Sequence, residues 1–125
     1  MQLIKVAITT DAAGAFSSSV TVPTNGGRLA QYRYVPAVAN LDTGADLTVS
    51  GATSGIVYIA QTDIGTSAFT KAPRQPTHDT AGVASLFAAA GEPVEGYIFV
   101  GGEPLSIVVA QGGDTKSGTL YLWIA

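Results

Sequence analysis

The chain of 125 residues contains no cysteine, which excludes disulfide bonds, thiolate catalysis and zinc sites built on sulfur ligands. Charge is also scarce, because only 12% of the residues are Asp, Glu, Lys or Arg, about half of the roughly 25% that is usual in a soluble domain. The surface must therefore consist largely of Thr, Ser, Gly, Gln and Ala. Soluble proteins that stay apart from one another commonly do so by charge repulsion. We therefore expect this protein to assemble with itself or with a partner.

Positive charge is the scarcer of the two signs. The chain has six Lys and Arg residues against nine Asp and Glu residues, which gives a formal net charge of −3. The cations stand singly, at Lys5, Arg28, Arg33, Lys71, Arg74 and Lys116. Because they form no patch or stripe along the sequence, the electrostatic attraction on which nucleic-acid binding depends is missing. We expect no direct nucleic-acid partner.

Long apolar runs are absent too. No stretch approaches the roughly 18 consecutive apolar residues that a membrane-spanning helix needs. The first residues alternate like a strand and are interrupted by Lys5, whereas a signal peptide has a basic leader, an apolar stretch and a cleavage site. We therefore expect no membrane partner and no export signal, and a chain that stays soluble and unprocessed.

What the chain does contain is a series of short apolar alternations, separated by clusters of Gly, Pro, Asn or Asp. This pattern is typical of an all-β sandwich or barrel. We expect one domain over residues 1–125, a β-sandwich of about eight or nine antiparallel strands in which most strands have one buried and one wet face. The expected strands are residues 2–8, 16–22, 28–35, 46–50, 56–60, 66–70, 94–100, 104–110 and 118–124.

The strand pattern lapses between Lys71 and Gly91. A proline-bounded loop comes first, and residues 81–90 have the composition of one short helix that ends at Gly91. We expect a short helix or a long loop near 72–91. A long excursion in a small sandwich is often the place where a partner is held, and a passive crossover between strands is the alternative.

The last three expected strands carry apolar residues on both faces. Their large aromatic side chains are Tyr97, Phe99, Tyr121 and Trp123. A strand that is apolar on both faces is either central and doubly buried or covered by a partner. We therefore place these four residues either in the core or in a self-association surface.

The sequence Leu41-Asp42-Thr43-Gly44-Ala45-Asp46 resembles the motif of retroviral-type aspartic proteases, in which two carboxylates share a proton. A homodimer would supply the second aspartate. The surrounding sequence does not match that family, because residues 105–110 form a β-branched run and not the supporting helix. The candidate flap near residues 63–67 also has only one glycine. The other interpretation is a plain Asp/Gly turn that leads into a strand.

Other candidate chemistry is weak. Asp42 and Asp46 lack the ring of oxygen ligands and the closing glutamate of a calcium loop. His78 and Asp79 are adjacent on a loop, and no nucleophile is marked for them to activate. We therefore predict no catalytic residue, no cofactor, no metal ligand and no enzymatic activity.

Three segments together resemble a group of small tailed-bacteriophage virion proteins of the capsid decoration, or cement, type. They are LDTGADLTVSG at 41–51, RYVP at 33–36 and IVVAQGGDTKSGTLYL at 107–122. The likeness runs from about residue 28 to the end and is strongest in the final hairpin. Its motifs are glycine-rich turns and strands, so no catalytic residue is carried over.

The resemblance implies a small β-sandwich, often a jelly roll, which is made in the host cytoplasm and binds the outer surface of the phage head. The implied partners are the major capsid protein and the protein itself, as a homodimer or homotrimer. For contact with the capsid we favour the 71–80 loop with Lys71, Arg74 and His78, together with the N-terminal strand.

A carbohydrate-binding or adhesion module on the same sandwich is a further alternative. It predicts exposed aromatic side chains in a groove, and Tyr32 and Tyr34 share one strand face. The opposing interpretation is that both tyrosines line the core or an oligomer interface, since aromatic residues are often buried.

Overall fold

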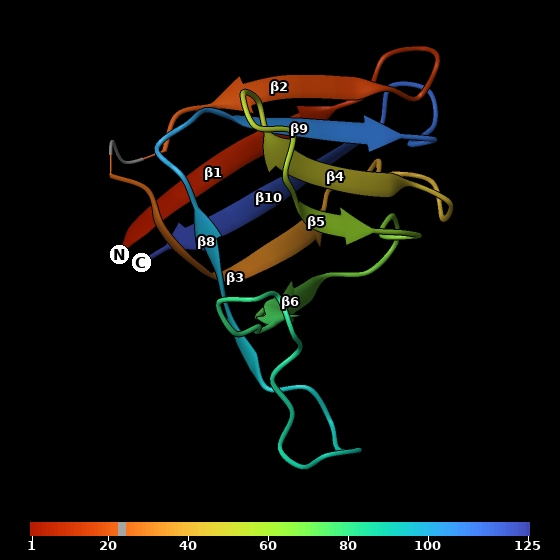
Figure 1. Cartoon of the computed structure of the whole chain (residues 1–125). Coiled ribbons are helices and arrows are strands. Elements are labelled where there is room, and N and C mark those ends of the chain that lie inside the picture. The colour runs from red at the N-terminus through yellow and green to blue at the C-terminus, as the bar shows by residue number, and fades with distance from the viewer. Residues whose placement is uncertain (23–24) are drawn as a thin grey trace.

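The computed structural model describes residues 1–22 and 25–125 and is all-β within them. Ten strands form one six-stranded and one four-stranded antiparallel sheet, which face each other (Figure 1). The strands are β1 Gln2–Thr9, β2 Phe16–Val20, β3 Gly27–Pro36, β4 Asp46–Gly51, β5 Val57–Gln61, β6 Phe69–Lys71, β7 Arg74–Pro76, β8 Glu95–Val100, β9 Leu105–Ala110 and β10 Ser117–Ile124. Among the described residues, no helix is long and apolar enough to cross a membrane.

The strand order is that of a jelly roll. The larger sheet runs β1-β10-β3-β8-β7, with β6 also paired to β3, and the smaller sheet runs β2-β9-β4-β5. The strands therefore pair in nested order, with the earlier strand of each pair further inward as the later one moves back along the chain: β1 with β10, β2 with β9, β3 with β8 and β4 with β5. Such nested pairing across two packed sheets defines the jelly roll. The expected jelly-roll-like β-sandwich is confirmed.

The core lies between the two sheets and follows the alternation of the sequence. In β10, Leu120, Leu122 and Ile124 are buried, whereas Tyr121 and Trp123 between them point to the other face. β9 and β4 repeat the pattern, with every second side chain buried. Because side chains on a strand alternate between two faces, one apolar residue in two is enough to build this core.

Tyr32 and Tyr34 of β3 belong to the core and do not line an exposed groove. Tyr34 is 0% exposed, and its hydroxyl donates a hydrogen bond to the carbonyl oxygen of Gly65 at 3.1 Å. Tyr32 is 4% exposed and donates to Oε1 of Gln61 at 3.2 Å. The ring of Phe69 packs on both tyrosine rings. The groove that the carbohydrate-binding alternative required is therefore absent at these residues, and the prediction that they line the core is confirmed.

Burial raises the pKa of the Tyr32 and Tyr34 hydroxyls above their ordinary value near 10, although the main chain of Leu41 lowers that of Tyr34 in part. In the unfolded chain both groups ionise near pH 10, while the folded protein keeps their protons. The stability that they contribute is therefore fully present below about pH 10 and is lost as the pH rises above it.

We accordingly expect the urea midpoint of unfolding to fall between about pH 9.5 and pH 11.5. The Tyr32→Phe, Tyr34→Phe double variant should show a flatter profile over the same range. Equal slopes in the two proteins would contradict the assignment of this pH dependence to the buried phenols.

Two expectations about residues 72–91 need correction. Residues 81–90 form no helix, so of the two alternatives the long loop is right. An isolated helix shorter than about 12 residues is marginal in water, and this segment has no neighbouring surface on which to pack one. The strand β7, Arg74–Pro76, was also not expected, because its three residues are all exposed and show no alternation.

Candidate functional site

The Asp42-Thr43-Gly44 motif forms a tight turn that leads into β4. The amide of Ala45 donates to the carbonyl oxygen of Asp42 at 3.0 Å, and the amide of Asp42 donates to the carbonyl oxygen of Gly112 at 2.9 Å. The Asp42 carboxylate is packed so closely on Gly113 that a Cβ at that position would lie 2.6 Å from its oxygens. These contacts tie the motif to the β9–β10 loop of the same chain and give its aspartate a structural role.

The segment that would be the protease flap is held in place by the core. Gly65 is buried against the main chain of Leu41 and Asp42 and accepts the hydrogen bond from Tyr34. Downstream, residues 105–110 form strand β9 and not a helix, as the β-branched sequence predicted. The motif therefore sits in a fixed corner of a jelly roll.

His78 and Asp79 do not act on each other. The Asp79 carboxylate accepts hydrogen bonds from the amides of Ala81 and Val83, both at 2.9 Å, and so closes a turn of its own chain. His78 is exposed. Within residues 1–22 and 25–125, no pocket opens and no group of three or more His, Cys, Asp or Glu side chains is placed to hold a metal ion. A binding site formed by these residues therefore lies on the open surface.

The outward face of the larger sheet carries the four aromatic residues that the sequence marked. Tyr97 and Phe99 are exposed, whereas Tyr121 and Trp123 are half-buried and stack with ring centroids 6.1 Å apart. None of the four belongs to the core. Of the two placements given by the sequence, the core is therefore wrong, and self-association stays a prediction.

Cations are interleaved with these rings. Tyr121 lies between Lys5 on β1 and Arg33 on β3 in the strand register, and Phe99 lies opposite Arg28. Directly opposite residues have Cβ atoms about 5 Å apart, so the rings of Tyr121 and Phe99 each have a cation beside them. We call this surface the aromatic face. Its members are Leu3, Lys5, Arg28, Arg33, Arg74, Glu95, Tyr97, Phe99, Tyr121 and Trp123.

Tyr97 forms the best defined contact of the aromatic face. The guanidinium carbon of Arg74 lies 4.2 Å from the centre of the Tyr97 ring, and that of Arg28 lies 4.9 Å from it. Both distances are within the range of a cation–π interaction, which contributes about 0.5–1 kcal/mol at exposed sites. The ring therefore favours positions of both arginine side chains close to it on the surface.

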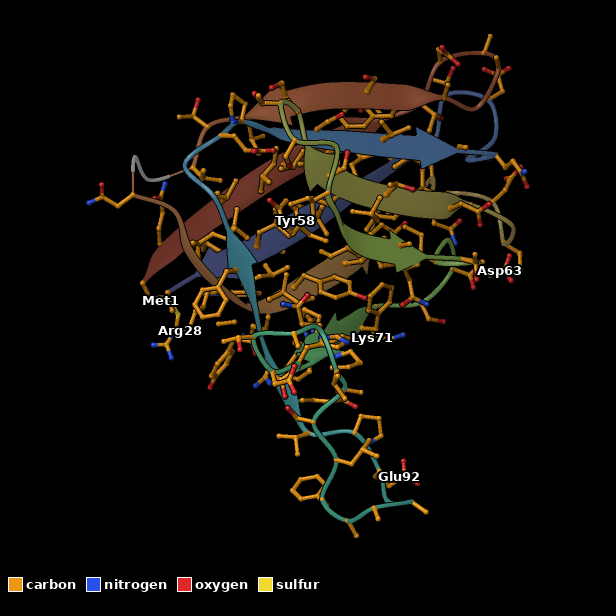
Figure 2. All side chains as sticks on the ribbon, viewed as in Figure 1. Met1, Arg28, Tyr58, Asp63, Lys71 and Glu92 are labelled. Carbon is orange, nitrogen blue, oxygen red and sulfur yellow. The ribbon has the colours of Figure 1, made fainter. Side chains whose placement is uncertain are left out.

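The aromatic face gives the molecule an uneven distribution of charge. Four of the six cations of the chain lie on it, and Glu95 is the one carboxylate in its strands, so its formal charge is +3. The rest of the chain has two cations and eight carboxylates, a formal charge of −6. Figure 2 shows Arg28 and Asp63 on opposite sides of the molecule. The sequence alone did not show this separation, because the four cations come from β1, β3 and β7, which are far apart along the chain.

The three residues predicted to touch a capsid are not brought together. Lys71 lies opposite inward-facing Tyr32 and donates to Oε1 of Gln61 at 2.8 Å, so it points toward the smaller sheet. Arg74 lies on the other side, over Tyr97. His78 follows β7 at the start of the long loop. All three are exposed, but they do not form one cluster.

Residues 77–94, which we call the arm, leave the sandwich between β7 and β8 and extend well away from both sheets (Figures 1 and 2). The arm is ordered by its own main chain: the amide of Thr77 donates to Val94 at 2.8 Å, that of Val94 to Ser85 at 2.9 Å and that of Ser85 to Thr77 at 2.9 Å. Nearer the tip, the amide of Phe87 donates to Glu92 at 3.1 Å. The arm therefore keeps a defined shape without packing on the body.

Apolar side chains on the arm are exposed. Phe87 is 78% exposed, and Val83 and Leu86 are exposed as well. Neighbouring large apolar residues exposed on an ordered segment indicate a contact surface. The sequence contained the signal for this surface, since these residues lie where the strand alternation lapses. Without the fold, however, they were indistinguishable from one face of a short helix.

Comparison with models of known protein families gave no match, and comparison with curated proteins gave none either.

Proposed function

We propose that the protein is a capsid decoration, or cement, protein, which binds the outer surface of an assembled phage head and stabilises the shell. The observation that carries the proposal is the exposed apolar surface of a jelly roll whose described residues form no pocket. Surfaces of this kind suit docking onto another macromolecule. The scarcity of charge and the resemblance of the turns and of the final hairpin support the same proposal.

The proposed mechanism is thermodynamic. A protein that binds the assembled shell, and not its free subunits, stabilises the shell by RT ln(1 + [L]/Kd) at each site. At a free concentration of about 100 Kd this amounts to about 2.7 kcal/mol per site, and the many equivalent sites of a shell multiply the effect. No chemical step is needed, so the protein requires only a stable fold and a complementary surface.

The test is sedimentation of the purified protein with undecorated phage shells. We expect the protein to pellet with the shells in a saturable manner, and decorated shells to withstand a higher temperature than bare ones. A protein that stays in the supernatant at every concentration tested would contradict the proposal.

Lys71 and His78 lie outside the aromatic face and remain proposed shell contacts. The Lys71→Glu, His78→Glu double variant should bind shells several-fold more weakly, because a change of charge at the edge of an interface mainly slows association. The matched control is Lys116→Glu, which changes a cation of the β9–β10 loop and should bind like the wild type. Equal binding by all three proteins would remove these two residues from the contact.

A further inference from the structure

The arm of one molecule and the aromatic face of another are complementary, and we propose that copies of this protein associate by docking the arm of each onto the aromatic face of the next. The inference goes beyond the proposed function, because it concerns contact between copies and not contact with a shell. It assigns one occupant, a second copy of this chain, to both exposed surfaces. The proposal is built from apolar area, charge and position in the fold.

Apolar area is left uncovered on both surfaces. The arm presents Val83, Leu86 and Phe87, and the aromatic face presents Leu3 and Phe99, the latter 68% exposed. Burying apolar surface contributes about 25 cal/mol for each Å² removed from water. Aromatic and arginine side chains are also enriched at the energetic centres of protein interfaces. The arm supplies a projecting apolar tip, and the aromatic face supplies rings bordered by arginines.

Charge decides which surface docks on which. The arm contains the carboxylates of Asp79 and Glu92 and no Lys or Arg, so its formal charge is −2 with His78 neutral. The aromatic face has a formal charge of +3. Two aromatic faces packed against each other would oppose eight cations with only two carboxylates, and two arms would oppose like charges. Like charges placed together across an interface are costly, so the arm of one copy against the aromatic face of another is the favoured pairing.

The position of the arm permits contact with a neighbour. The main-chain hydrogen bonds that order its residues run within residues 77–94, and Figure 2 shows Glu92 far from the sandwich. The arm leads directly into β8, which carries Tyr97 and Phe99, so each copy offers both halves of the contact. A contact between two different surfaces is heterologous and produces a closed ring when the rotation between copies closes.

The first experiment measures self-association of the full chain by sedimentation velocity and light scattering over a range of concentrations. We expect the wild type to form a discrete oligomer. Phe87→Ser on the arm and Phe99→Ser on the aromatic face should each weaken self-association about thirtyfold or more, because truncating a central aromatic residue commonly has an effect of that size. Val38→Ser is the control, since Val38 is an exposed apolar residue of the β3–β4 loop, outside both surfaces.

A matched pair of charge changes tests the electrostatic part. Glu92→Lys on the arm should weaken self-association, whereas Asp114→Lys, an equal change of charge on the exposed β9–β10 loop, should not. Raising the salt concentration should weaken association of the wild type, because exposed charges are screened within about 8 Å at physiological ionic strength. Equal effects of the two reversals would overturn the charge argument.

Mixing the two aromatic variants is the decisive measurement. Phe87→Ser retains an intact aromatic face and Phe99→Ser retains an intact arm, so a mixture of the two should form a one-to-one complex although each alone is monomeric. Contact between two aromatic faces or between two arms would not be restored by mixing. Thermal unfolding of each variant, expected near that of the wild type because both side chains are exposed, separates lost association from lost folding.

The result that overturns the proposal is a monomeric wild type at every concentration, an oligomer that neither aromatic variant weakens, or a mixture that forms no complex. The shell experiment is independent of these outcomes. An oligomer of the predicted kind that fails to bind shells would refute the proposed function and leave the arm contact standing. A monomer that binds shells would refute the arm contact and leave the proposed function standing.

Discussion

Replacing Gly65 with alanine is expected to lower the free energy of unfolding by about 3 kcal/mol, at the upper end of the range for overpacking. An added Cβ would lie 1.8 Å from the carbonyl oxygen of Asp42 and 2.6 Å from that of Leu41. These are main-chain atoms and cannot turn away like the end of a flexible side chain. The loop before β6 would have to separate from the turn before β4, which would also break the hydrogen bond from Tyr34 to Gly65.

Urea unfolding followed by the fluorescence of Trp123 measures the effect, and Gly44→Ala is the matched control. Gly44 lies in the neighbouring turn, and the nearest atom to an added Cβ is the side-chain oxygen of Gln111 at 3.8 Å, so its replacement should change stability by less than about 0.5 kcal/mol. A Gly65→Ala protein as stable as Gly44→Ala would show that the two loops are not in contact.

The second large effect is expected at Tyr34. Truncation to alanine should reduce stability by about 3–5 kcal/mol, because it removes a fully buried ring and leaves a cavity that the surrounding sheets cannot close. The ring packs on Gly118, where an added Cβ would lie 2.7 Å from a ring carbon, and on Phe69. A loss of this size is a large part of the roughly 5–15 kcal/mol that stabilises a typical domain, so the midpoint of thermal unfolding should fall by many degrees.

Two further variants divide this effect into its parts. Tyr34→Phe keeps the ring and removes the hydroxyl that bonds to Gly65, so it should cost about 1–3 kcal/mol, the penalty for one unsatisfied buried group. Phe99→Ala removes a ring of similar size from the opposite face of the larger sheet and should be nearly neutral in the dilute protein, since Phe99 is exposed. Equal losses in Tyr34→Ala and Phe99→Ala would contradict the assignment of inner and outer faces.

Most strands of the jelly roll were predictable because their signal is local. Leu120, Leu122 and Ile124 alternate with Tyr121 and Trp123 along the last five residues of β10, and a period of two is the signature of a strand whatever it pairs with. The turn at Asp42 was equally predictable from the sequence, since Asp42 and Gly44 suit a turn before a strand.

The candidate surfaces were not predictable in the same way. Tyr32 and Tyr121 are both aromatic strand residues, yet one is buried and the other lies on the outward face. In β10 the side chains on both faces are apolar. The sequence pattern therefore does not show which of the two faces packs against the second sheet. For a related reason the sequence left the arm open between a short helix and a long loop. Its alanines favour a helix, but residues 81–90 have no packing surface around them and form turns and isolated bridges instead.

The sequence by itself determined the class of the fold, the positions of its turns and the scarcity of charge, because alternation, glycine placement and composition act over a few residues or need no geometry at all. The tertiary structure alone decided that Lys5, Arg28, Arg33 and Arg74 share one face with four aromatic rings, while an acidic arm extends from between β7 and β8. These residues share one face because of the register between strands that are distant in the chain. Register depends on which long-range pairings bury the most apolar surface together, and that is a property of the whole folded molecule.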